Sequence, residues 1–113
     1  SRGLGDVYKR QGYMIERIDN QIAFYQGKID ALNDDINSQN VLIENCKKDI
    51  ESYQDRLTYQ TDQEQQETNK LINDAQNTIK TANGDIDTDN ASIEEYNERI
   101  TLLEEQKVQY KEN

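Results

Sequence analysis

The chain contains no histidine, no proline and no tryptophan, and it has a single cysteine among its 113 residues. Histidine is the commonest general base and a frequent metal ligand, so its absence removes the usual catalytic and metal-binding arrangements. One cysteine, Cys46, cannot form an intrachain disulfide, although an interchain bridge stays open. The sequence therefore excludes a secreted disulfide framework.

Apolar residues are also scarce. They make up 33% of the chain, against roughly 45–50% in ordinary globular domains. Unbroken apolar runs are only a few residues long, so we expect no membrane insertion. Charged residues reach 32% with a net charge of −10, and an acidic balance disfavours contact with phosphate backbones. We therefore expect neither a thick globular core nor a nucleic-acid partner.

Residues 1–12 stand apart from the rest of the sequence. The string SRGLGDVYKRQ lacks a helical periodicity and resembles translated sequencing-library adapter. A natural disordered terminus is the alternative. We predict a non-native or disordered segment here and leave it out of the fold argument; on the adapter reading, the true N-terminus, with any signal segment, lies upstream.

From residue 13 onward, apolar residues recur at alternating intervals of three and four. Every isoleucine except Ile18 occupies the heptad a position. Such spacing places a narrow apolar stripe along a helix, and that stripe must be buried against another helix. The pattern predicts an all-α coiled coil. Its a positions hold Ile15, Ile22, Ile29, Ile36, Ile43, Ile50 and Leu57, followed by Ile72, Ile79, Ile86, Ile93 and Ile100.

The two blocks of heptads are one residue out of phase, and residues 58–70 between them are almost entirely polar. Continuing the first register would bury Glu64 and Glu67, which is costly. We therefore predict a long antiparallel helical hairpin with arms 13–57 and 71–111 and a connector at 58–70. Two alternatives stay open: one continuous helix, because the connector lacks Gly and Pro, or a third helix after Asn83-Gly84.

Two polar residues, Gln39 and Asp89, interrupt the predicted seam. Mirror symmetry about the connector brings them close together and sets Tyr53 and Cys46 near Ala75 and Ala82, although pairing a with d shifts this register by about half a heptad. Buried polar residues commonly control register, and a protonation or cation trigger is the functional alternative. We interpret Cys46 as a small buried side chain.

An acidic segment follows Asn83. Its oxygen-bearing residues match the ligand spacing of an EF-hand loop, but Thr88 occupies the position that needs glycine. We predict at most weak calcium binding there, and a solvated acidic helix face is the alternative. The candidate metal ligands are Asp85, Asp87, Asp89 and Glu94. We expect no other cofactor and no catalytic residues, because no nucleophile–base pair or phosphate loop is present, and we expect the protein not to be an enzyme.

Three consecutive segments of the chain resemble the trichocyst matrix proteins of ciliates. They are ALNDDINSQNVLIENCKKDIESYQDRL at residues 31–57, an acidic Gln/Glu run and then TNKLINDAQNTI. That resemblance covers residues 15–111 and implies a processed secretory-granule protein with a cysteine in its first arm, here Cys46. It also implies self-assembly, with copies of itself or related coiled-coil proteins as partners, and a secretory-granule or extracellular location. A coiled-coil tether, adaptor or cytoskeletal segment of a longer protein is the alternative function.

Overall fold

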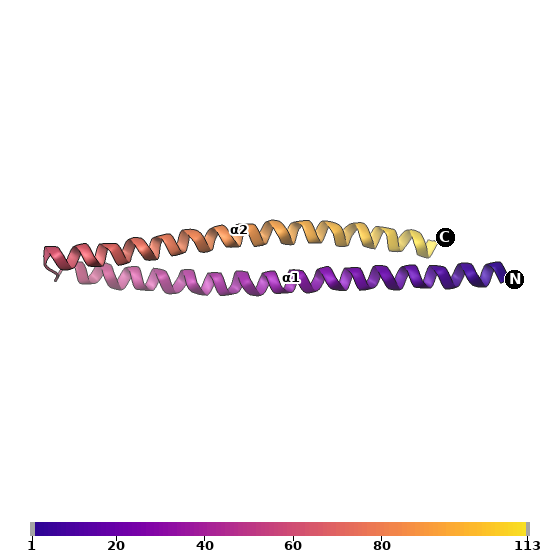
Figure 1. Ribbon diagram of the computed structural model, residues 1–113, viewed down its shortest axis with the longest axis horizontal. Helices are drawn as coiled ribbons and strands as arrows, with labels where there is room; N and C mark the ends of the chain where they lie inside the picture. The colour runs from indigo at the N-terminus through magenta and orange to yellow at the C-terminus, as the bar shows by residue number, and fades with distance from the viewer. Residues whose placement is uncertain (1, 113) are drawn as a thin grey trace. The chain divides into compact units, whose positions relative to one another are not determined.

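The computed structural model describes residues 2–112, which form two α-helices and no strand. Helix α1 runs over Arg2–Leu57 and helix α2 over Asp62–Glu112. The chain reverses between them, so the predicted antiparallel helical hairpin is confirmed (Figure 1). The alternatives of one continuous helix and of three helices are wrong, because α1 ends at Leu57 and α2 runs without a break through Gly84.

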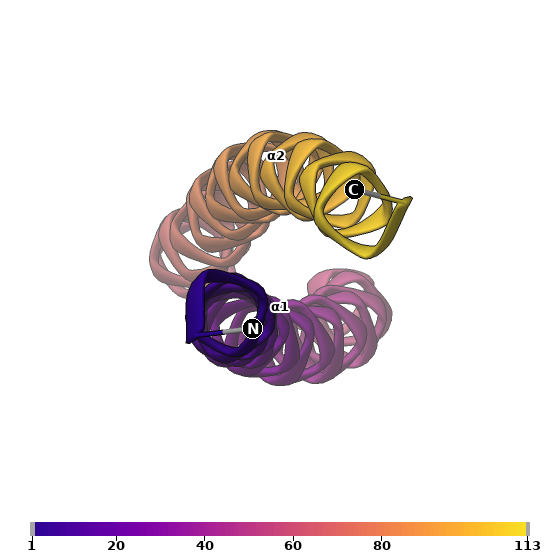
Figure 2. The same cartoon turned by 90° about the vertical axis from the view of Figure 1, so that its right-hand side faces the viewer.

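The hairpin comprises two compact units. Unit 1 joins the first part of α1, up to Leu32, to the last part of α2, from Ala91. Unit 2 contains residues 33–90 and includes the reversal of the chain. Within unit 1 the start of α1 and the end of α2 lie side by side in the end-on view (Figure 2). Each unit therefore contains one antiparallel pair of helical segments.

Burial follows the predicted heptads. In unit 1 Ile18, Ile22 and Ile100 form a buried cluster, against which Tyr25, Ile29, Leu103 and Tyr110 pack. In unit 2 the buried apolar residues are Ile43, Cys46, Ile72 and Ala82. The core is thus a single stripe between two helices, as expected for a coiled coil. Within residues 2–112 neither helix is apolar enough over a sufficient length to cross a membrane.

Helix α1 begins earlier than we expected. The structure places residues 2–12 in a helix and not in a disordered segment, and the non-native origin of this segment stays a prediction. Two physical reasons favour the extension: no proline interrupts it, and Gln11 donates a hydrogen bond from its side-chain amide to the backbone carbonyl of Tyr110. The glycines in this segment each cost only about 1 kcal/mol in a helix.

Helix α2 also begins earlier than expected, so the connector shrinks from 58–70 to 58–61. Gln65 and Thr68 continue the register of the second block back towards the turn, and Thr68 is buried. The hydroxyl of Thr68 donates to the side-chain oxygen of Gln60 at 2.7 Å. Polar side chains can occupy this end of the seam because they bond to each other and to the turn.

The start of α2 is fixed by a capping box at Thr61 and Glu64. The backbone N–H of Thr61 donates to the Glu64 carboxylate at 3.2 Å, and the backbone N–H of Glu64 donates to the Thr61 hydroxyl at 3.3 Å. The side-chain amide of Gln65 donates to the carbonyls of Leu57 and Gln60. These bonds satisfy groups at both helix ends, so the reversal needs neither glycine nor a positive φ.

Candidate functional site

The most unusual feature of the seam is a pair of carboxyl groups in unit 2. Asp89 of α2 lies within hydrogen-bonding reach of Asp35 of α1. The Oδ2 atom of Asp89 is buried and accepts no hydrogen bond from the described residues. No lysine or arginine within residues 2–112 forms an ion pair with either carboxyl group. Two carboxylates are both acceptors, so they bond to each other only when one carries a proton.

This environment favours the protonated form of Asp89. The contact with Asp35 raises the pKa of Asp89 most, followed by burial, by the charge of Asp35 and by the charge of Asp85. Gln39, which mirror symmetry set near Asp89, lines a hollow with Ala82 and Asp85. The residue that contacts Asp89 across the seam is Asp35, one turn before Gln39 on α1, and pairing a with d was expected to shift the register by about half a heptad.

The candidate calcium ligands are not gathered around one point. Asp85 and Asp89 are one turn apart on α2 and share a face, whereas Asp87 lies about half a turn away from both. Asp85 and Asp87 are exposed and Asp89 is half-buried. Glu94 is exposed and belongs to unit 1, while the three aspartates belong to unit 2. No group of three possible metal ligands occurs among residues 2–112.

Cys46 and four of the seven tyrosines, Tyr25, Tyr53, Tyr96 and Tyr110, occupy seam positions. Cys46 is 8% exposed and unbonded, as a small buried side chain would be. In unit 1 the rings of Tyr25 and Tyr96 stack at 5.6 Å between centroids, and the guanidinium of Arg99 lies over both. Arg99 also bonds to Glu95 at 2.6 Å. Tyr25 and Tyr96 therefore fill the seam of unit 1 and contact a cation of the same chain.

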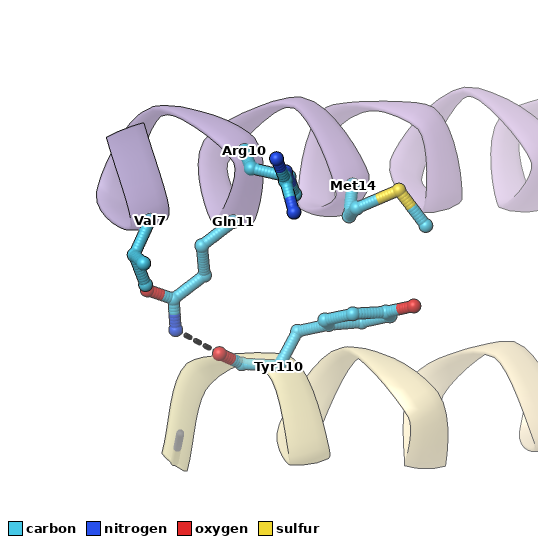
Figure 3. Close-up of a pocket in the computed structure, with 5 residues that line it drawn as sticks. All are labelled: Val7, Arg10, Gln11, Met14 and Tyr110. Carbon is cyan, nitrogen blue, oxygen red and sulfur yellow. Dashed lines mark hydrogen bonds between the residues drawn. The ribbon is translucent and has the colours of Figure 1, made fainter. Parts of the chain in front are cut away.

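An apolar hollow of about 390 Å³ lies at the end of unit 1 (Figure 3). Val7, Arg10, Gln11 and Met14 of α1 and Tyr110 of α2 line it. Figure 3 shows the bond from Gln11 to the Tyr110 carbonyl closing one side. Three of these five residues, Val7, Arg10 and Gln11, belong to the N-terminal segment that resembles adapter sequence.

Sequence reasoning missed Asp35, Thr61 and Glu64. The capping box has a recognisable signature, Thr followed three residues later by Glu, within the polar run that we assigned wholly to the connector. Asp35 had a weaker signal: it precedes the seam residue Ile36 and therefore flanks the stripe. Its role became visible only with the pairing of the helices.

Comparisons with protein-family models, with curated proteins and with solved structures find no match for this chain.

Proposed function

We propose that this protein is a structural coiled-coil protein that assembles with further copies of itself or with related coiled-coil proteins. The observation that supports this most directly is the thinness of its core. Among the residues that the structure describes, seven apolar side chains are buried and no large side chain is buried completely. A single seam of this kind is a marginal core for a small chain, and association is a common way to enlarge it.

The surface area supports the same proposal. The chain exposes 8510 Å², whereas a compact protein of 13.2 kDa exposes about 6,400 Å². The difference is of the same order as the roughly 1,200–2,000 Å² that a standard protein interface buries. Large apolar side chains outside the seam, including Phe24, Leu42 and Leu102, would supply part of that contact. Association would therefore bury surface that this chain leaves in water.

The proposed setting is a secretory-granule matrix, as the resemblance to trichocyst matrix proteins implies. Chains of net charge −10 repel one another when they pack side by side, so screening by salt, mild acid or divalent cations would promote assembly. Asp85, Asp87 and Asp89 are the densest acidic stretch on which a cation would act. The position of Asp87 away from Asp85 and Asp89 favours the second candidate, a coiled-coil tether or adaptor that ignores calcium.

Sedimentation velocity over a range of protein concentrations tests self-association. A structural matrix protein should shift to a dimer or larger species as concentration rises, and a chain that stays monomeric would contradict the proposal. Calcium-dependent light scattering then separates the two functions. A matrix protein should condense with millimolar calcium. Replacing Asp85, Asp87 and Asp89 together by Asn should weaken that condensation. A tether should show no calcium response.

A further inference from the structure

One face of unit 2 combines an exposed apolar side chain with a hollow beside it. Leu42 of α1 is 41% exposed, and it borders a hollow of about 390 Å³. Small side chains of α2 line the other side of the hollow: Thr78, Thr81 and Ala82. A bulky apolar knob and a hollow lined by small residues thus lie next to each other on the same surface.

This face carries little charge in a strongly acidic protein. Residues 36–43 of α1, which include Leu42, contain no charged side chain. On α2, residues 75–84 contain only Lys80, and Asp85 is the single charged residue that lines the hollow. Two copies with a net charge of −10 each experience the least repulsion where their surfaces are least charged. Low local charge therefore reduces the repulsion that a second copy would meet at this face.

The arrangement is also self-complementary. In a two-fold dimer the same patch of each copy faces the other. The protruding side chain of one copy can then enter the hollow of its partner, and the partner's side chain enters the hollow of the first. Leu71, which is 44% exposed, lies two turns before Thr78 on the same side of α2 and would extend the contact. We propose that a second copy of this chain docks here, with Leu42 of each copy entering the hollow of the other. This inference rests on the proposed self-association and names its surface.

The test compares Leu42→Glu with Val41→Glu in the full chain. Val41 is the adjacent residue, is also apolar and exposed at 61%, and lies on the side of α1 that faces away from the seam. Both variants add one negative charge, so a general increase in repulsion affects them equally. Leu42→Glu should raise the dimer dissociation constant at least about tenfold, and Val41→Glu should change it by no more than about twofold.

A second measurement guards against a variant that fails to fold. Spin labels at Thr81→Cys and at Val41→Cys, each in a Cys46→Ala background, report only distances between copies because each chain carries one label. The Thr81 label should give the shorter interchain distance. Equal effects of the two glutamate variants, or a shorter distance from Val41, would overturn the proposed surface while leaving self-association standing. A wild-type chain that remains monomeric would overturn self-association itself.

Discussion

Asp35 of α1 and Asp89 of α2 bring two carboxyl groups into contact across the seam of unit 2, and no group within residues 2–112 donates a hydrogen bond to the buried Oδ2 atom of Asp89. A proton on Asp89 turns this contact from a repulsion into a hydrogen bond. The pair therefore links the stability of the hairpin to pH. It is also the strongest local departure from the apolar pattern of the seam.

We predict that Asp89→Asn stabilises the hairpin at neutral pH and flattens its pH dependence. The folded pKa of Asp89 is raised above its ordinary value of 3.8, so its contribution to stability is present below that value and is lost as pH rises through the raised pKa. An asparagine keeps the shape and donates to Asp35 at any pH. Thermal melts monitored by circular dichroism between about pH 4 and pH 7 measure this change in stability and in its pH dependence.

The matched control is Asp87→Asn, which removes the same charge from an exposed position two residues away. It should raise the melting temperature at neutral pH less than Asp89→Asn does, and it should leave the slope against pH close to that of the wild type. Identical profiles for the two variants would show that net charge alone, and not the contact with Asp35, governs the pH dependence.

The capping box predicts a cost for Thr61→Ala. Loss of the hydroxyl leaves the backbone N–H of Glu64 without its partner, and a lost N-cap costs about 1 kcal/mol. Denaturant unfolding should detect this loss. Gln66→Ala, at an exposed site in the next turn, should lie close to the wild type. If the two variants were equally stable, the capping bonds would contribute nothing measurable.

Glu64 should show the opposite pH behaviour to Asp89. The Thr61 backbone N–H and then the Thr61 hydroxyl bond to its carboxylate and lower its pKa below 4.5. The contribution of Glu64 is therefore present above that ordinary value and is lost as pH falls through the lowered pKa. Carboxyl NMR titration should find the midpoint of Glu64 below the ordinary glutamate value of 4.5, and Thr61→Ala should move it upward.

The stacked tyrosines of unit 1 should be energetically coupled. A double-mutant cycle with Tyr25→Leu and Tyr96→Leu should give a coupling of about 0.5–1.5 kcal/mol, the usual range for an aromatic pair in contact. Tyr53 lies on the same helix as Tyr25 but many turns away, so Tyr25→Leu and Tyr53→Leu should be additive. Additivity of the Tyr25 and Tyr96 variants would contradict the stack.

Cys46 should be protected from thiol reagents in the folded chain. Its side chain is buried in the seam of unit 2, so modification requires the hairpin to open. The rate of labelling should fall many-fold between denaturing and native conditions, and a cysteine introduced at exposed Val41 in a Cys46→Ala background should label rapidly in both. Rapid native labelling of Cys46 would instead favour the accessible thiol that an interchain disulfide needs.

Most of the fold followed from heptad spacing. The positions predicted to face the partner helix, from Ile15 to Leu57 and from Ile72 to Tyr110, are the ones that the structure buries or half-buries. The phase slip located the reversal, but the predicted connector was too long because the polar run 58–70 hid the Thr61–Glu64 capping signature that starts α2 at Asp62. Polar residues of the connector were compatible with a helix once Thr68 and Gln60 could bond to each other.

The sequence by itself determined that this chain forms two helices with one shared apolar stripe, because a repeat of three and four residues is a local property of each helix. Only the tertiary structure decided which side chains meet across that stripe. A slip of one turn between the helices keeps the apolar stripe in the seam yet changes which polar residue of α1 contacts Asp89, and in the structure that residue is Asp35. The apolar pattern hardly distinguishes the two registers, because both keep the stripe buried. The packing of individual side chains across the seam selects one of them.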